Sequence, residues 1–364
     1  NGIIAIIALY NNGYTDIQII EKNPNYRDII DNRTTNLSVK SLNFFDQLDV
    51  GNEIRNNASK IMQIVVQDID ASGHIVYGDE NQQEAMGYVI NNNILRRILF
   101  DKLDELKIEV IIREYQSIEF AHQSSIVFDD NDTMQADLFI CAEGRNSKLK
   151  KFVACDTHDY EQTCMILNVE HREEHHNIAY ETFFPCGPFA ILPLKNPYQS
   201  SIIWTEEAVN KDLYLSYDNN KLMTCIESRS HLKLIKILNN INHYNISLNK
   251  VKKYYYKNIV FIGDAAHAIH PVAGQGLNLG IYDTISLIHH LKKYKNRTEM
   301  LSNFNDDRIK NNAVIINTTH HIINIFKRDN CISNYIISKG FNLINKTKTI
   351  KNMLVKYATG SNIY

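Results

Sequence analysis

NIVFIGDAAHAIHPVAGQGLNLG, residues 258–280, places a continuously apolar run directly before Gly263-Asp264 and a glycine-rich loop. An apolar run without alternation is typical of a parallel strand that is covered on both faces. Ligands of open α/β sheets bind at the carboxyl ends of such strands, which is where Asp264 is expected. We therefore predict a ligand site at the end of this strand.

A helix is predicted to follow the loop, because apolar residues recur there at helical spacing. Its amino terminus would point free N–H groups and partial positive charge at the ligand. A carboxylate suits ribose or ribityl hydroxyls, and a helix amino terminus suits a phosphate or a ring that carries negative charge. Reduced flavin offers both features, a polyol chain and a negative N1–O2 edge. The expected helical stripe consists of Leu277, Ile281, Ile285, Ile288 and Leu291.

The first residues resemble the second half of a nucleotide-binding βαβ unit. NGIIAIIALYNNG (residues 1–13) predicts a helix, and DIQIIEKN (residues 16–23) predicts a strand that ends in Glu21. Gly2 stands where the third glycine of G-x-G-x-x-G would stand, and Glu21 follows 19 positions later, near the roughly 20 expected for an acid that binds ribose. Any αβ unit with an acidic strand end gives the same pattern. We expect the strand with the first two glycines to lie upstream.

Between these segments, an α/β pattern is interrupted by a β-rich stretch. Residues 31–48 are expected to form a loop that leads into a helix, and residues 60–78 alternate as strands do. Residues 87–103 start extended and become helical. Residues 136–152 predict a buried strand, a turn and a helix capped by Ser147. Strand-like stretches dominate residues 160–257, as in an inserted substrate domain, and the chain after the opening motif reads as largely helical.

Size and composition limit the possible functions. The chain has 364 residues, enough for two domains or one composite domain, and 44% hydrophobic and 22% charged residues are ordinary values. A net charge of −2 argues against nucleic acid as the main partner. The six cysteines are scattered, which favours reduced thiols in a cytoplasmic protein over a disulfide framework. No apolar run approaches the roughly 18 residues that span a bilayer.

Several segments, in the same order along the chain, match the motifs of one enzyme family. GDAAHAIHPVAGQGLNLGIYD (263–283) resembles a flavin-binding motif, and RTTNLS (33–38) is similar to R-T-T-A-L-S. CAEGRNSKLK (141–150) resembles A-D-G-x-x-S-x-x-R, although Glu143 replaces the aspartate. The remaining similar segments are GYVINNNIL (87–95) to G-Y-V-V-E-N, and ETFFPCGPFAILPL (181–194) with SSIIWT (200–205) to R-F-x-x-x-G-P-x-A-x-L-P-L and the strand after it.

This set of motifs is similar to that of the FAD-dependent aromatic hydroxylases, above all the ubiquinone-biosynthesis branch of 2-polyprenylphenol and 2-polyprenyl-6-methoxyphenol hydroxylases. The resemblance implies an α/β fold with an FAD-binding Rossmann-like domain of the glutathione-reductase type. It also implies an inserted, mainly antiparallel β-sheet substrate domain and a helical C-terminus. The expected parts are a discontinuous FAD-binding domain (1–59, 84–159 and 255–300), a β-rich substrate domain (60–83 and 160–254) and a C-terminal helical segment (301–364).

The resemblance assigns cofactor roles residue by residue. Gly2 would face the FAD pyrophosphate, and Glu21 would bind the adenosine ribose. Arg33 would lie by the pyrophosphate or the flavin, and Asn91 would lie near the flavin. Asp264 would bind the ribityl and pyrophosphate region.

The glycine-rich loop receives the catalytic roles. Pro271 would border the flavin where oxygen reacts. With Gly274 and Gln275 it would form the catalytic part of the loop. Gly276, Leu277 and Asn278 would complete the cofactor site. The residues that would hold the pyrimidine edge are Gly274, Gln275, Gly276, Leu277 and Asn278.

The implied reaction has two halves. NAD(P)H, a transient co-substrate, reduces FAD, and the reduced flavin captures O₂ as a C4a-hydroperoxide that hydroxylates a polyprenylated phenol. Tyr180, His175 and His176 are candidate bases with nothing to rank them. Two alternatives stay open: an FAD-dependent oxidase or reductase without hydroxylation, and a non-catalytic remnant of the fold. His267 and His270 are spaced as H-x-x-H, but a third ligand does not stand out, so no metal is expected.

The C-terminal part of the chain is basic. Residues 291–364 carry thirteen Lys or Arg and four Asp or Glu, which a lysine-rich composition alone could produce. The functional hypothesis is a patch that holds the enzyme at the inner membrane, where a polyprenyl substrate resides. The resemblance also raises a complex with other ubiquinone-biosynthesis proteins.

Overall fold

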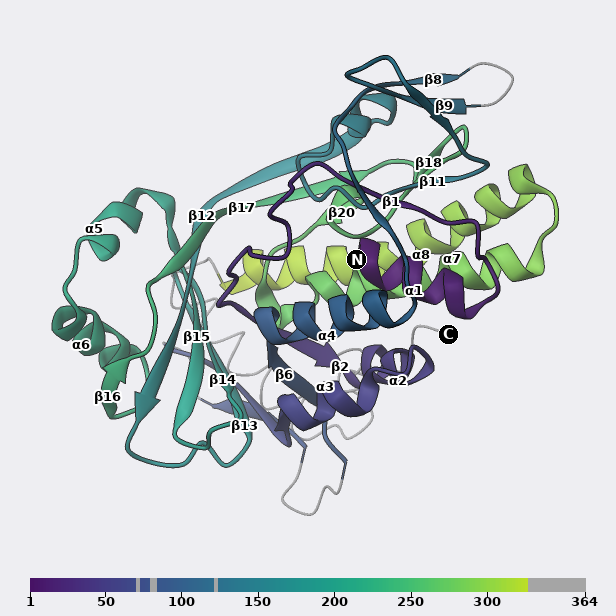
Figure 1. Cartoon of the computed structure of the whole chain (residues 1–364). Coiled ribbons are helices and arrows are strands. Elements are labelled where there is room, and N and C mark those ends of the chain that lie inside the picture. The colour runs from purple at the N-terminus through teal and green to yellow at the C-terminus, as the bar shows by residue number, and fades with distance from the viewer. Residues whose placement is uncertain (70–72, 79–83, 121–123, 327–364) are drawn as a thin grey trace.

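A layer of helices and short parallel strands lies beside one large, mainly antiparallel sheet (Figure 1). The computed structural model describes residues 1–69, 73–78, 84–120 and 124–326. The sheet stands on the left of Figure 1, and the helices fill the centre and the right. The predicted α/β fold with a mainly antiparallel β region and a helical part toward the C-terminus is confirmed.

Short strands that pair in parallel end at Glu21 or shortly before Asp264, the acids that the sequence places at strand ends. β1 (Ile19–Glu21) pairs in parallel with β7 (Val110–Ile112), and β11 (Phe139–Cys141) pairs in parallel with β19 (Ile259–Phe261). All three residues of β19 are fully buried, as its continuous apolar sequence predicted. β18 (Tyr255–Tyr256) pairs antiparallel on the other side of β19.

Helices α1, α4 and α7 pack around a shared apolar core. The predicted stripe of α7 contributes Ile281 and Ile288, which are buried, and its other members pack against the same core. Helix α1 is apolar on nearly all sides because it is buried between α4 and α7. The helices of this layer are α1 (Gly2–Asn11), α2 (Val39–Gln47), α3 (Gly51–Asn57), α4 (Asn92–Glu105) and α7 (Gly276–Lys293).

The expected loop within residues 31–48 is wrong, because a strand precedes the helix there. β2 (Thr34–Ser38) pairs antiparallel with β6 (Gly87–Asn91), which also pairs with β3 (Ser59–Ile61). Leu37 is the fully buried apolar residue of β2, and its neighbours are Thr, Asn and Ser. A strand held mainly by main-chain pairing leaves little hydrophobic period in its sequence.

The helix predicted after β11 is present as a 3-10 helix. It is η1 (Lys148–Phe152), a five-residue 3-10 helix that ends where the predicted stretch 136–152 ends. Ser147 does cap it, because its hydroxyl accepts a hydrogen bond from the Leu149 N–H at 3.1 Å.

The large sheet gathers strands from distant parts of the chain. Its central strand, β12, is long enough to pair with three neighbours, and one parallel pair, β13 with β4, departs from the antiparallel pattern. The order is β20 (His267–Ala268), β17 (Asn242–Val251), β12 (Cys155–His171), β15 (Gln199–Glu207), β14 (Gly187–Pro193), β13 (Ile178–Phe184), β4 (Gln63–Asp68) and β5 (His74–Tyr77), with β16 (Leu234–Ile237) paired to β12.

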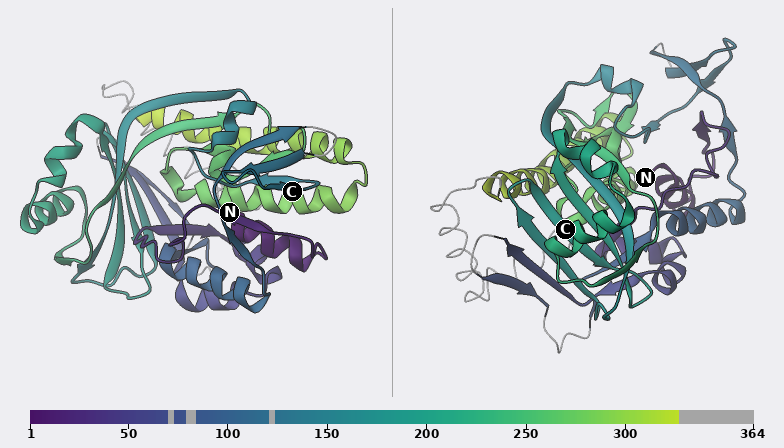
Figure 2. Two further views of the ribbon diagram at one scale, coloured as in Figure 1. Left: turned by 45° about the horizontal axis from the view of Figure 1, so that its top comes forward. Right: turned by 90° about the vertical axis from the view of Figure 1, so that its left-hand side faces the viewer.

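Alternation of side chains gives this sheet two different faces. Leu167 and Trp204 point to one face, where helices α5 and α6 cover the strands (Figure 2, right). Their neighbours Ile166 and Ile203 point to the opposite face, toward the glycine-rich loop. The covering helices are α5 (Lys211–Leu215) and α6 (Asn219–Arg229).

Helix α8 (Arg297–Phe326) runs along α7 and reaches the sheet (Figure 1). The rest of the expected segment 301–364, with most of its basic residues, lies outside the described residues. None of the helices in the described part of the chain combines the length and apolarity needed to cross a membrane. The further short elements are β8 (Tyr115–Phe120), β9 (Ser124–Phe128), β10 (Thr133–Gln135), η2 (Ala208–Asn210), η3 (Gly263–Ala265) and η4 (Val272–Gly274).

The packing of α7 predicts an unequal cost for two isoleucine truncations. Ile281 is fully buried in the shared core, so Ile281→Ala should lower the free energy of unfolding by about 2 to 5 kcal/mol. Ile309 on α8 is 42% exposed, and Ile309→Ala should cost less than about 1 kcal/mol. Urea denaturation measures both variants, and equal losses would contradict this placement of α7.

Candidate functional site

A cavity of about 630 Å³ lies between the strand ends, the start of α7 and the large sheet. Glu21 closes β1 and Asp264 follows β19, and both line this cavity, as expected for acids at strand ends. The sheet contributes an apolar wall, so the cavity is polar toward the strands and apolar toward the sheet. That wall consists of Ile166, Leu192, Ile203 and Tyr244.

The turn that carries Asp264 is fixed by its neighbours. Gly263 has a φ of 59°, a left-handed conformation that favours glycine. Its N–H donates to Asp283 Oδ2 at 2.9 Å, and Lys150 Nζ donates to the main-chain oxygen of Asp264 at 3.1 Å. These contacts hold the main chain of the turn, and Asp264 lines the cavity.

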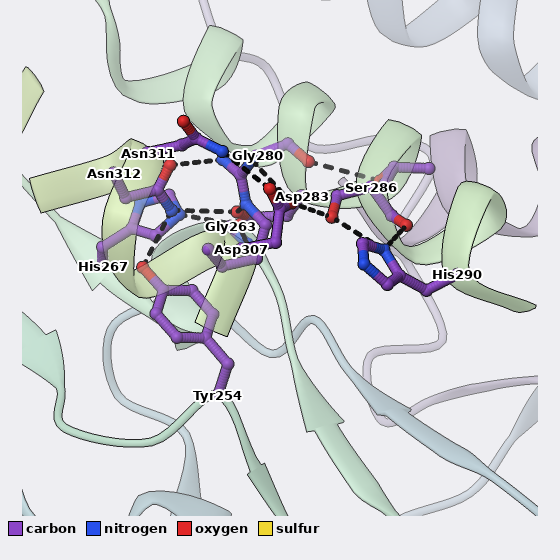
Figure 3. Close-up of polar contacts among 12 residues, drawn as sticks. Tyr254, Gly263, His267, Gly280, Asp283, Ser286, His290, Asp307, Asn311 and Asn312 are labelled. Carbon is purple, nitrogen blue, oxygen red and sulfur yellow. Dashed lines mark hydrogen bonds and ion pairs between the residues drawn. The ribbon is translucent and has the colours of Figure 1, made fainter. Parts of the chain in front are cut away.

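Asp283 belongs to a polar network that is buried between α7 and α8 (Figure 3). Its carboxylate accepts from Arg308 Nε at 2.9 Å, from Asn312 Nδ2 at 3.0 Å and from His267 Nε2 at 2.6 Å. Asn312 Nδ2 also donates to the hydroxyl of Tyr254 at 2.8 Å. Burial opposes ionisation of Asp283, but the nearby His267 and Arg308 outweigh it and lower its pKa to about 2. The carboxylate is therefore ionised at neutral pH.

His270 shapes the loop that follows. It is fully buried, its Nδ1 accepts from the Val272 N–H at 3.2 Å, and its Nε2 lies 3.3 Å from Gln162 Oε1. Because Nδ1 accepts, Nε2 carries the proton and donates to Gln162. Burial lowers the pKa of His270 to about 3, so the ring is neutral. Both histidines of the H-x-x-H pattern are thus engaged in hydrogen bonds within the fold.

The first turn of α7 is tied to β2 and α2. Asn278 is fully buried, and its side-chain oxygen accepts from the Ser38 N–H at 2.9 Å and the Ser41 hydroxyl at 2.7 Å. Its amide donates to the main-chain oxygen of Asn36 at 2.9 Å. Gly274 has a φ of 60°, and a Cβ there would lie 3.1 Å from Asn36 Cβ. A side chain at Gly274 would therefore need Asn36 of β2 to shift.

Charged groups from the segment after β1 form another wall. Arg33 donates to Asp31 through Nε at 2.7 Å and through Nη2 at 2.6 Å, and both residues line the cavity. Burial opposes ionisation of Asp31, but hydrogen bonds from Arg33 and Asn92 lower its pKa below the ordinary value. This wall presents one guanidinium whose charge is balanced by one carboxylate.

The structure brings most of the expected site residues to this cavity. Glu21 and Asp264 lie at the strand ends, and Arg33 lies on the charged wall. The expected residues that line the cavity are Glu21, Arg33, Asp264, Pro271, Gly274, Gly276 and Leu277.

The other expected residues are not among the described residues that line it. Asn91 caps α4, because its side chain accepts from the Asn93 N–H at 2.9 Å. Gly2 opens α1 where a Cβ would lie 3.3 Å from Ala142, and Gln275 is a buried residue directly before α7. Asn278 ties α7 to β2 and α2, as described above.

The residues that sequence reasoning missed come from the large sheet and from the turn after β11. Tyr244 of β17 lines the cavity, with the guanidinium carbons of Arg33 and Arg145 at 5.9 Å and 5.6 Å from its ring centre. Tyr180, one of the unranked candidate bases, instead lies 4.2 Å, centre to centre, from the ring of His231. His175 Nε2 donates to the main-chain oxygen of Leu194 at 2.8 Å. The alternation along β17 divides its residues into two faces. The sequence alone does not show which of the two faces the cavity, so Tyr244 could not be assigned to the site.

Comparison with known proteins adds a family and relatives. The model of the FAD binding domain family matches residues 1–315. The chain is 25% identical over 344 residues to the ubiquinone hydroxylase UbiL of Rhodospirillum rubrum, a match that covers 91% of this chain and 80% of the relative. It is 24% identical over 341 residues to the mitochondrial ubiquinone biosynthesis monooxygenase COQ6 of Homo sapiens, a match that covers 78% and 73%. These matches confirm the resemblance seen in the motifs.

A solved structure shares the fold. Klebsiella pneumoniae HpxO, solved in complex with FAD and uric acid, superimposes with a TM-score of 0.77 over 98% of this chain and 94% of that chain. The two sequences are 13% identical, so the likeness concerns the fold. It confirms the expected fold class, and the family match confirms FAD as the cofactor.

The buried neutral His270 predicts a specific pH dependence of stability. Its pKa falls from 6.5 in the unfolded chain to about 3 in the folded protein, so the unfolded state binds a proton that the folded state excludes. The contribution of the neutral His270 ring to the unfolding free energy is fully present above pH 6.5 and is lost as the pH falls from there toward 3. Between pH 7 and pH 5 this one group should remove about 2 kcal/mol of unfolding free energy. Urea denaturation of the wild type and His270→Gln should show a smaller loss in the variant, and identical losses would contradict the assignment.

Proposed function

We propose that the chain, which belongs to the FAD binding domain family, is a flavin-dependent monooxygenase that hydroxylates the aromatic ring of a polyprenylated phenol in ubiquinone biosynthesis, with NAD(P)H and O₂ as co-substrates. The similarity to ubiquinone hydroxylases and monooxygenases over most of the chain supports this activity. The observation that carries it is a continuous cavity with a polar, acid-lined part that extends to an apolar sheet wall.

The polar part of the cavity fits FAD. A Cβ at Gly276 would meet nothing within 4 Å, so open space lies over the start of α7. Free N–H groups at such a helix end suit an electron-rich ring edge or a phosphate. Glu21 and Asp264 offer carboxylates to ribose and ribityl hydroxyls, and Arg33 offers a guanidinium to the pyrophosphate. The donor and acceptor set thus matches the groups of a flavin dinucleotide.

The apolar wall fits an aromatic substrate with a hydrocarbon tail. Ile166, Leu192 and Ile203 come from neighbouring strands and line the same cavity as Pro271 and Leu277. Apolar ligands bind in such walls because their surface leaves water. A polyprenylated ring would therefore lie against the sheet, on the side of the cavity away from Glu21.

FAD, when bound, supplies hydride acceptance and oxygen activation. The chain orients the ring and excludes water, through the buried loop at His270 and the apolar sheet wall. The amino terminus of α7 would stabilise negative charge on the bound ring. Burial raises the pKa of Tyr244 well above its ordinary value, so its hydroxyl stays protonated and acts as a wall or a donor and not as a base.

Other expectations stay predictions. A peripheral contact with the inner membrane of a cytoplasmic enzyme depends on the basic C-terminal region, most of which lies outside the described residues. A complex with other ubiquinone-biosynthesis proteins is equally untested.

The activity is tested with purified protein loaded with FAD. We expect NADH or NADPH oxidation that is accelerated by a short-chain polyprenylphenol, with one hydroxylated product for each reduced nicotinamide consumed. Mass spectrometry under ¹⁸O₂ should place one labelled oxygen in the product. Stoichiometric H₂O₂ with every phenol tried would favour an oxidase instead, and protein that takes up no FAD would support a non-catalytic remnant.

Two glycine substitutions separate cofactor binding from backbone strain. Gly274→Ala and Gly13→Ala both force alanine into a positive φ, at 60° and 87°, which costs about 1 kcal/mol or more. Gly274 lines the cavity and lies against Asn36, whereas a Cβ at Gly13 meets nothing within 4 Å. Fluorescence titration should show at least about ten-fold weaker FAD binding for Gly274→Ala. Gly13→Ala should bind FAD as the wild type does, and similar affinities in both variants would exclude the loop as a cofactor contact.

A further inference from the structure

One fully buried carboxylate, that of Asp283, accepts four hydrogen bonds (Figure 3). Oδ2 accepts from the Gly263 N–H at 2.9 Å and from His267 Nε2 at 2.6 Å. Oδ1 accepts from Arg308 Nε at 2.9 Å and from Asn312 Nδ2 at 3.0 Å. The four donors come from the turn at Asp264, the strand β20 and helix α8, so one side chain of α7 joins three other elements.

Stability alone is a weak reason for this arrangement. Taking a carboxylate and a guanidinium out of water costs several kcal/mol for each ion, and replacing a buried ion pair by apolar residues is often neutral or stabilising. The side chains of Asp283 and Arg308 are both 0% exposed, so the ion pair is completely desolvated. A role beyond joining α7 to α8 would explain why this contact is polar.

The distinctive contact is the one to the main chain of Gly263. This residue directly precedes Asp264 and has a φ of 59°, and its buried N–H needs an acceptor. Asp283 supplies that acceptor from α7, the helix whose amino terminus faces the same cavity. The bond therefore fixes the position of Asp264 relative to the start of α7.

We propose that Asp283 is a positioning residue for the cofactor: through the Gly263 N–H it sets Asp264 against the amino terminus of α7, and through Arg308 it couples this geometry to the docking of α8. The inference rests on the proposed function in that the cavity binds FAD. Because coupling between two sites is reciprocal, FAD binding should also stabilise α8 around Arg308. Helix α8 thus acts on the cofactor site without touching the cofactor.

Replacement by asparagine shows why a carboxylate is required. The asparagine side chain of Asp283→Asn would have nearly the same size but only one acceptor oxygen and an NH₂ group. With the NH₂ in the place of Oδ2, His267 could change tautomer and accept from it, but the Gly263 N–H could not. With the NH₂ in the place of Oδ1, it would face the donors of Arg308 and Asn312. Either orientation sets donor against donor, so the turn or α8 must shift.

The experiment compares Asp283→Asn with the control Asp307→Asn. Asp307 lies on α8 near the same guanidinium, at 3.7 Å from Arg308 Nη1, and accepts from the Ser286 hydroxyl on α7, whereas the Gly263 N–H donates to Asp283. The readouts are the dissociation constant for FAD, the visible spectrum of the bound flavin, and hydrogen exchange of α8 amides with and without FAD. None of them requires a phenol substrate.

We expect Asp283→Asn to raise the FAD dissociation constant at least ten-fold, to shift the flavin absorption bands, and to abolish the protection that FAD gives to α8 amides. Asp307→Asn should change the dissociation constant less than three-fold and keep the protection. If Asp283→Asn does not fold, Arg308→Lys tests the same coupling, because it keeps the charge but changes the donor geometry. It should weaken FAD binding at least three-fold and reduce the α8 protection.

Opposite outcomes overturn the inference. Unchanged FAD affinity and spectrum in Asp283→Asn, with only a lower unfolding free energy, would make the network merely structural, and so would α8 exchange that FAD does not alter in the wild type. Wild-type FAD binding and hydroxylation with unaffected variants would refute the inference alone. Wild-type protein that binds no FAD would refute both the inference and the proposed function.

Discussion

The geometry of the site depends on the hydrogen bonds that the carboxylate of Asp283 accepts. This carboxylate lies where α7, α8 and the turn after β19 meet, and it satisfies a main-chain N–H as well as three side chains (Figure 3). A carboxylate is stable in such a buried position only when both of its oxygens accept hydrogen bonds. The helix that points its amino terminus at the cavity and the turn that carries Asp264 are therefore held to each other, and α8 is held to both.

The second constraint is the alternation of the large sheet. Leu167 and Trp204 pack under α5 and α6, and this leaves Ile166 and Ile203 for the opposite face. That face closes the cavity whose other side holds Glu21 and Asp264. A cofactor that carries sugar hydroxyls and an aromatic ring system can thus meet an apolar substrate within one shared space. The fold supports the proposed hydroxylation by this continuity of a polar and an apolar part.

Local patterns made much of this predictable from sequence. The apolar run of β19, the helical stripe of α7 and the acid that ends β1 each follow from neighbouring residues, and all three were found where expected. The strand β2 was not predicted, because its residues are mostly polar and it is held by main-chain pairing. The hydrogen bond from Arg308 to Asp283 was not predicted, because the two residues lie on different helices and an acid in a helix usually faces water. Asn91 and Asn278 matched a motif, but the structure uses their amides to hold a helix cap and a strand.

A crystal structure of the protein with FAD bound tests the central claim most directly. The account predicts that the ribityl chain and pyrophosphate lie beside Asp264 and that the isoalloxazine lies between the start of α7 and the wall formed by Ile203 and Tyr244. It also predicts that the adenosine ribose lies at Glu21 and that the bond from Gly263 to Asp283 is retained. FAD bound outside this cavity, or with its flavin turned away from α7, would contradict the account.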